Sequence, residues 1–110
     1  MAVTKRILGQ NAPGGTTLTD LYTVPSGKQA TTSSLVVCNR IAALARFRIS
    51  VAASGVADAP LQYLFYDVAL EGNDTFVATI GLTLAASDKV RCQTDLANLS
   101  FSLFGAEEDV

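Results

Sequence analysis

The chain has 110 residues, a formal net charge of −2 and neither histidine nor tryptophan. This length fits one domain, and 49% hydrophobic with 16% charged residues allows a buried core and argues against disorder. The basic residues are thinly spread, so no basic patch indicates nucleic-acid binding, and no apolar run is long enough to span a membrane. Lys5 and Arg6 are not followed by the apolar segment of a signal peptide, so we expect synthesis in a cytoplasm.

Residue patterns that carry catalysis are scarce. Without histidine, the many serines and threonines lack the commonest general base, and no G-x-S-x-G elbow or glycine-rich phosphate loop occurs. Asp67, Glu71 and Asp74 could form a catalytic pair or, with Asn73, a calcium site, but ordinary turn positions explain them better. The two distant cysteines indicate free buried thiols rather than a zinc site or a disulfide. The sequence predicts no enzyme, no cofactor and no metal site.

The first third of the chain reads as strands around a turn. Residues 3–10 are predicted to form a first strand or an extended arm, and residues 11–15, with proline and two glycines, a loop. Residues 16–24 alternate as a strand does. Residues 25–28 predict a tight turn, because proline presets φ and glycine supplies a positive φ. The long alternating segment 29–39 is the predicted central strand.

The middle of the chain repeats this pattern. Residues 40–43 are expected to form a turn, and residues 45–53 a strand that points Phe47 and Ile49 inward and Arg46 and Arg48 outward. A loop is predicted at residues 54–60. The following strand, residues 61–70, is rich in aromatics. Its alternation predicts one face with Leu61, Tyr63 and Phe65 and another with Leu64, Tyr66, Val68 and Leu70.

The last third contains the most regular alternation. Residues 75–84 are predicted as a single strand, residues 89–94 as a shorter one, and residues 98–104 as the closing strand. After Gly105 we expect an acidic tail. The predicted core residues, all apolar and on inward positions of these strands, are Phe47, Ile49, Phe76, Ile80, Leu82 and Phe101.

Together these segments predict an all-β fold, a single β-sandwich of Greek-key or jelly-roll type with seven to eight antiparallel strands. The expected organisation is an N-terminal arm or first strand plus glycine-rich loop (residues 1–15), a β-sandwich domain (residues 16–105) and an acidic C-terminal tail (residues 106–110).

Three stretches resemble a family of small virion proteins of tailed bacteriophages, commonly described as tail-fibre or structural proteins. They are YTVPSGK leading into SLVVCN, EGNDTF leading into IGLTLAASDK, and the closing LSFSLFG. The resemblance covers about residues 19–105, and residues 40–46 depart from it. It implies a β-sandwich in a virion and no catalytic residues.

We therefore expect a structural virion component attached to the tail, neck or fibre apparatus. It would associate with itself, as a homotrimer or larger ring, and with other virion proteins, but with neither nucleic acid nor membrane. One alternative is a capsid decoration protein on the head surface. A second is a carbohydrate-binding module for the host surface that uses Tyr63, Tyr66 and exposed loop carboxylates, although the absence of tryptophan and histidine and the short loops argue against it.

Candidate subunit-interface residues come from the expected arm, an outward strand face and the acidic tail. Arg46 and Arg48 have few acidic residues near them in the sequence, so they either face an acidic neighbour, such as the acidic tail of another copy, or form a solvated strand face that opposes edge aggregation. Polar strand positions at residues 31–34 and at Ser100 and Ser102 also suit subunit contacts. The full set of predicted interface residues is Ile7, Leu8, Arg46, Arg48, Glu107, Glu108 and Asp109.

Overall fold

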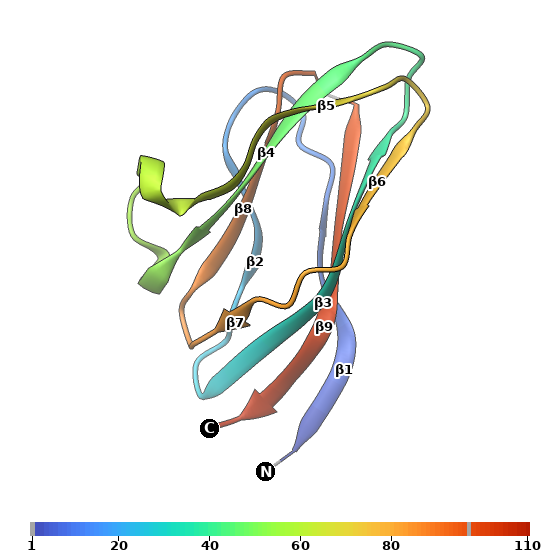
Figure 1. The fold of residues 1–110 in the computed structure, drawn as a ribbon. Coiled ribbons are helices and arrows are strands. Elements are labelled where there is room, and N and C mark those ends of the chain that lie inside the picture. The colour runs from blue at the N-terminus through green and yellow to red at the C-terminus, as the bar shows by residue number, and fades with distance from the viewer. Residues whose placement is uncertain (1, 97) are drawn as a thin grey trace.

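In the computed structural model, which describes residues 2–96 and 98–110, the chain forms a sandwich of two antiparallel sheets (Figure 1). The strands are β1 (Val3–Asn11), β2 (Thr19–Thr23), β3 (Lys28–Asn39), β4 (Ala45–Ala52), β5 (Tyr63–Leu70), β6 (Thr75–Ala78), β7 (Thr83–Leu84), β8 (Lys89–Thr94) and β9 (Leu99–Asp109). Two short 3-10 turns, η1 (Ala53–Gly55) and η2 (Pro60–Gln62), separate β4 from β5. In the described part of the chain, no helix is long and apolar enough to cross a membrane. The predicted all-β sandwich is confirmed.

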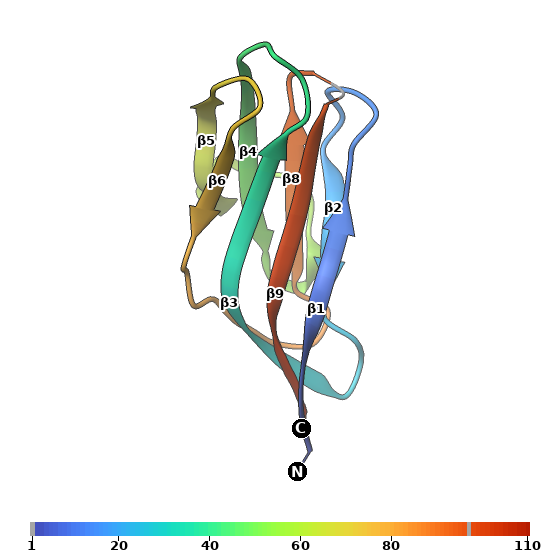
Figure 2. The same ribbon diagram turned by 90° about the vertical axis from the view of Figure 1, so that its right-hand side faces the viewer.

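The strands pair as one long hairpin that is folded over on itself. β1 pairs with β9, β2 with β8, β3 with β6 and β7, and β4 with β5, all antiparallel. Two further pairings, β9 with β3 and β8 with β4, join these pairs side by side. The result is a five-stranded sheet in the order β1-β9-β3-β6, with β7 also on β3, facing a four-stranded sheet in the order β2-β8-β4-β5 (Figure 2). This is the strand arrangement of a jelly roll.

Apolar side chains from both sheets fill the space between them. Phe47 of β4 lies among three other aromatic rings, and the ring centroids of Phe65, Phe76 and Phe101 are 6.4, 5.2 and 6.1 Å from its own. All six predicted core residues face inward: Phe47, Ile49 and Phe101 are buried, and Phe76, Ile80 and Leu82 are partly buried against them. The alternation in the sequence therefore located the core.

The predicted strand at residues 75–84 is interrupted and forms two strands, β6 and β7. This division accounts for the ninth strand in the described residues. The hydroxyl of Thr32 donates to the carbonyl oxygen of Ile80 at 2.7 Å and accepts from the backbone N–H of Leu82 at 2.8 Å. A side chain thus replaces ladder bonds between β6 and β7. The prediction of one continuous strand was wrong because these bonds come from β3, far away in the sequence.

Strand β5 switches faces at Asp67. This residue has a φ of 53°, and the register with β4 shifts between the pair Phe47–Val68 and the pair Ile49–Phe65. The resulting β-bulge turns both Phe65 and Val68 toward the core. The predicted face shared by Leu64, Tyr66, Val68 and Leu70 is therefore wrong from the bulge onward.

Strand β9 passes through Gly105 and ends at Asp109, so residues 106–109 are part of the five-stranded sheet. Both of its neighbours carry a bulge beside Gly105, at Leu8 in β1 and at Ser33 in β3. A Cβ at Gly105 would lie 2.3 Å from the carbonyl oxygen of Thr31, so glycine is needed where the sheet bends. Beyond this bend, the ends of β1, β3 and β9 continue together past the body of the sandwich (Figure 1).

The two cysteines lie in different sheets and are free, as predicted. Cys92 of β8 is buried, and its burial raises the pKa of the thiol to about 12. Cys38 of β3 is only partly buried, on the outer side of the five-stranded sheet. The expectation that both thiols are buried therefore holds for Cys92 alone.

Candidate assembly surfaces

The five-stranded sheet has an outer face without charged residues over the body of the sandwich. Its positions are those that alternate with the buried residues of β1, β3, β6 and β9. We call this surface the uncharged face, and it consists of Ile7, Gln10, Thr31, Ser34, Val36, Cys38, Thr75, Val77, Ser100, Ser102 and Phe104. The exposed Lys5, which lines a shallow hollow together with Thr31 and Phe104, marks the boundary of this face at the bend. Interface cores of proteins are depleted of charge, so this face shares its low charge with subunit interfaces.

Larger apolar side chains cross the uncharged face in a diagonal row. Ile7 pairs with Phe104 across β1 and β9, and Val36 pairs with Val77 across β3 and β6. Ile7 and Val77 are 49% and 60% exposed, although both are apolar. Serines 34, 100 and 102 surround the row, so the polar strand positions noted in the sequence lie together here. Because these serine side chains are small, the apolar row remains accessible to a partner protein with a flat surface.

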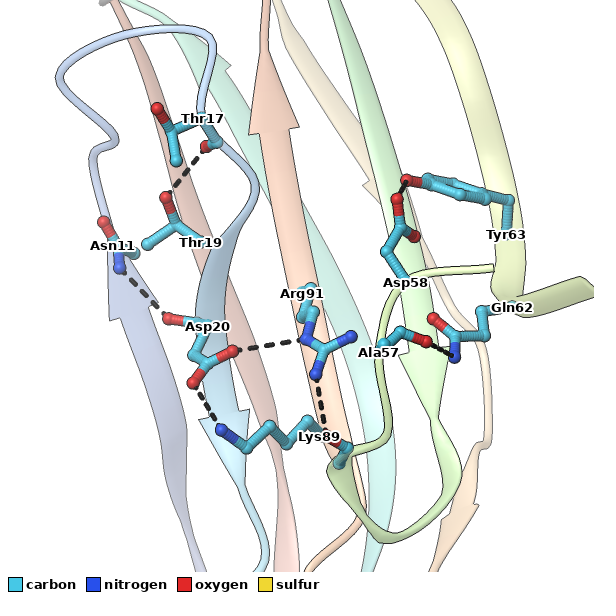
Figure 3. Close-up of polar contacts among 11 residues, drawn as sticks. Asn11, Thr17, Thr19, Asp20, Ala57, Asp58, Gln62, Tyr63, Lys89 and Arg91 are labelled. Atoms are coloured by element: carbon cyan, nitrogen blue, oxygen red, sulfur yellow. Dashed lines mark hydrogen bonds and ion pairs between the residues drawn. The ribbon is translucent and has the colours of Figure 1, made fainter. Parts of the chain in front are cut away.

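The outer face of the four-stranded sheet is covered by charged side chains. Asp20 of β2 accepts from Lys89 Nζ at 2.7 Å and from Arg91 Nε at 3.4 Å, both on β8 (Figure 3). The hydrogen bond from Lys89, with that from Arg91, lowers the pKa of the Asp20 carboxyl. We call this surface the charged face, and its charged members are Asp20, Arg46, Arg48, Asp67, Lys89 and Arg91.

Arg48, predicted to lack acidic neighbours, has one in its own chain. Its Nε and Nη2 donate to the two carboxylate oxygens of Asp67 at 2.7 and 3.2 Å. This guanidinium holds the pKa of the Asp67 carboxyl below its usual value. The expectation that Arg48 has few acidic neighbours was wrong, because the bulge in β5 places Asp67 beside Arg48 on the paired strand β4. Arg46 is exposed, and its guanidinium has no ion pair among residues 2–96 and 98–110.

Two of the predicted interface residues point into their own subunit. Leu8 is part of the buried core. The buried carboxylate of Glu107 accepts from the hydroxyl of Tyr22 at 2.5 Å and from Arg6 Nη1 at 3.5 Å. Burial, with this hydrogen bond to Glu107, raises the pKa of Tyr22 above its usual value. These contacts tie β9 of one sheet to β2 of the other, and the sequence carries no local signal for them.

The other predicted residues at the ends of the chain remain accessible. Ile7 lies on the uncharged face. Glu108 accepts a hydrogen bond from Gln29, and Asp109 accepts from Lys28 Nζ at 2.6 Å. Both acidic side chains are only partly buried.

The two tyrosines of the carbohydrate hypothesis come together at the edge strand β5. Their ring centroids are 5.1 Å apart, although alternation had placed Tyr63 and Tyr66 on opposite faces. A hollow of about 520 Å³ lies beside them, and its lining comes from β4, β5 and the segment before β5. Asp58, which accepts from the Tyr63 hydroxyl, is a loop carboxylate of the kind expected for this hypothesis. Arg48 was not expected there, because it meets the tyrosines only through the pairing of β4 with β5.

No protein-family model matches the sequence, and no curated protein matches it. Solved structures do match the fold. A structure of the infectious bursal disease virus Gx strain aligns with a TM-score of 0.57 and 11% identity, over 96% of this chain and 32% of the matched chain. The VP2 subviral particle of that virus aligns with a TM-score of 0.55 and 12% identity, over 96% of this chain and 31% of the matched chain. The acidic stable capsid structure of Helicobacter pylori bacteriophage KHP30 aligns with a TM-score of 0.49 and 17% identity, over 96% of this chain and 92% of the matched chain.

The chain spans about a third of the length of the two bursal disease virus chains that it matches. At these identities the likeness establishes a shared fold. The sandwich is thus of a kind found in viral capsid proteins.

Proposed function

We propose that the protein is a non-enzymatic structural component of a bacteriophage virion that acts by associating with copies of itself and with neighbouring virion proteins. The sandwich fold, which aligns over 96% of the chain with a chain of the VP2 subviral particle, carries this proposal. Jelly rolls also occur in lectins and cupins, so the outer surfaces have to distinguish these classes. The uncharged face favours protein–protein association.

Within the virion, we propose a position on the capsid surface, as a decoration or shell protein, ahead of the tail, neck or fibre. Support comes from the likeness in fold to a chain of the VP2 subviral particle. Copy number separates the two positions, because a head surface offers many equivalent sites and a tail few. Quantitative mass spectrometry of purified virions, normalised to the major capsid protein, measures it. A few copies per particle would contradict the capsid position and favour the tail.

Association would proceed by burial of the uncharged face. Each Å² of apolar surface removed from water contributes about 25 cal/mol, and many weak contacts add up over a closed assembly. Ile7 and Val77, with the half-buried Phe104 between them, supply the apolar area. The serines around them can make hydrogen bonds across the interface without bringing buried charge. A homotrimer or larger ring is the expected product.

Light scattering on a size-exclusion column tests the proposal. The unmodified protein is expected to elute as an oligomer, and Val77→Asp to dissociate at least about tenfold more readily, because a carboxylate would be buried at the interface. Leu64→Asp is the matched control: Leu64 is 44% exposed on a strand of the opposite sheet, and this variant should associate normally. A monomeric unmodified protein, or equal weakening by both variants, would contradict association through the uncharged face.

A further inference from the structure

A hollow on the outside of the four-stranded sheet has the features of a ligand site. Its volume of about 520 Å³ lies within the range of small-molecule pockets, which combine aromatic walls with a few fixed polar groups. The lining residues are Arg48, Asp58, Ala59, Pro60, Tyr63 and Tyr66.

The aromatic walls are held in a fixed geometry. The rings of Tyr63 and Tyr66 meet edge to face, with an interplanar angle of 88°. Arg48 Cζ lies 3.9 Å from the centroid of the Tyr66 ring, and the carboxylate of Asp67 holds this guanidinium through Nε and Nη2. Although Tyr66 is 58% exposed, it is therefore positioned by a cation–π contact.

Polar groups flank these rings. The Tyr63 hydroxyl donates to Asp58 Oδ2 at 3.0 Å (Figure 3). In residues 2–96 and 98–110, no group donates to Asp58 Oδ1, and Arg48 Nη1 has no acceptor. The hollow thus offers a free acceptor from the loop and a free donor from β4.

The loop that carries Asp58 is anchored to the sheet. The side-chain amide of Gln62 donates to the carbonyl oxygen of Ala57 at 2.9 Å, and Arg91 Nη2 donates to that of Gly55 at 3.0 Å. Figure 3 shows the Gln62 contact beside the Tyr63–Asp58 contact. The N–H of Ser54 donates to Asp88 Oδ1 at 2.8 Å. A site fixed in this way loses little conformational entropy when a ligand binds.

The charges restrict the ligand. Arg48 and Asp67 offset each other, and Asp58 adds a carboxylate, so an anionic ligand is repelled. A cationic ligand would compete with the guanidinium that already lies over Tyr66. A neutral ligand with both hydroxyl groups and an apolar face satisfies all the lining groups.

We propose that this hollow binds a neutral saccharide. The apolar C–H face of a sugar ring would pack against the tyrosine rings, one hydroxyl would donate to Asp58 Oδ1, and another would accept from Arg48 Nη1. The site lies on the opposite sheet from the uncharged face, so a capsid-surface protein that assembles through the uncharged face would still present it to solvent.

Saturation-transfer NMR with lactose, cellobiose, maltose and N,N′-diacetylchitobiose tests this site. We expect at least one of these sugars to bind at millimolar concentration, and Tyr66→Ala to weaken that binding about tenfold through loss of the ring. Asp58→Ala should weaken it as well, by loss of the acceptor. Sialyllactose, which carries a negative charge, should bind no better than lactose. Absence of binding by all four neutral sugars would overturn the proposal.

Leu61→Ser is the matched control. Leu61 is 90% exposed next to the hollow but does not line it, so its replacement should leave sugar binding unchanged. Equal loss in Leu61→Ser and Tyr66→Ala would indicate a general apolar patch and would also overturn the site. Thermal unfolding of each variant separates loss of binding from loss of fold. Val77→Asp should bind sugar normally, so failure of this site and failure of the assembly proposal are distinguishable.

Discussion

The outer faces of the two sheets follow the same alternation but differ in chemistry. The uncharged face exposes serines and threonines around an apolar row that includes Ile7 and Val77. The charged face carries ion pairs such as Asp20 with Lys89 and Arg48 with Asp67. Both faces cover the same core, so burial inside the subunit does not require the difference. It supports the proposals that the uncharged face meets another protein and that the charged face stays open to water or a small ligand.

The difference also shows how the four-stranded sheet avoids unspecific association with the sheets of other molecules. Charges along outward strand positions oppose the edge-to-edge and face-to-face association of β-sheets. The charged face has this protection over the sheet that ends in the edge strand β5. The body of the uncharged face lacks it. The predictions that follow test first what joins the two sheets, and then what separates the two faces.

Phe47→Ala should have the largest effect, because this ring contacts aromatic residues of both sheets. We expect the free energy of unfolding in urea to fall by about 3–5 kcal/mol from lost burial and the cavity left behind. Leu61→Ala, at an exposed position, is the control and should be nearly neutral. A loss below about 1 kcal/mol would mean that the two faces are not supported by a shared core.

Tyr22→Phe removes the hydrogen bond that joins β2 to the buried carboxylate of Glu107. A hydrogen bond to a charged group contributes about 1.5–3 kcal/mol, and the free energy of unfolding should fall by that amount at pH 7. Because the pKa of Tyr22 is raised in the folded state, its contribution is complete below the unfolded pKa of about 10 and is lost as the pH rises further. Unfolding measured between pH 7 and pH 11 should show a smaller alkaline loss in the variant. Equal alkaline loss in both proteins would contradict this role.

Gly9→Ala probes the seam where β1 of one sheet passes β2 of the other. A Cβ at Gly9 would lie 2.0 Å from the carbonyl oxygen of Leu21, so the strands would have to separate. We expect a loss of about 1–3 kcal/mol in the free energy of unfolding. Gly14→Ala is the matched control, since a Cβ there meets nothing within 4 Å, and it should be neutral. Equal effects in the two variants would mean that close approach at the seam does not matter.

Arg48→Gln should have the smallest effect, because the Arg48–Asp67 pair is exposed to solvent and exposed pairs contribute little. The pKa of Asp67 is lowered in the folded state, so the pair stabilises the protein above the unfolded pKa of about 3.9 and stops doing so as the pH falls through the folded value. The stability difference between unmodified protein and variant should therefore disappear in acid and shrink in high salt. A difference that persists in acid would mean that stacking on Tyr66, rather than the ion pair, carries the effect.

Much of the fold could be predicted from local patterns. The turn after β2, the long β3 and the strands β4 and β8 all follow from alternation and turn residues, which act between near neighbours. The two wrong predictions within strands have causes that are distant in the sequence. Thr32 interrupts the segment between β6 and β7, and the bulge at Asp67 depends on how β5 is paired with β4.

The candidate surfaces could be predicted only in part. Ile7 was expected at an interface and lies exposed on the uncharged face. Leu8 is buried because it follows the outward Ile7 and alternation turns it inward, and the buried Glu107 is held by Tyr22 and Arg6 from distant strands. The uncharged face could have been found from the serines at alternate positions of residues 100–102, once the pairing of β9 with β3 was known.

The sequence by itself determined an all-β sandwich and its apolar core, since alternation decides which side chains leave water wherever the strands are placed. Only the tertiary structure decided which strands are neighbours, and hence that uncharged positions from four strands form one surface and that Arg48, Asp58 and two tyrosines form another. The physical reason is that strand order depends on pairings between distant segments, whereas alternation is a property of each segment alone.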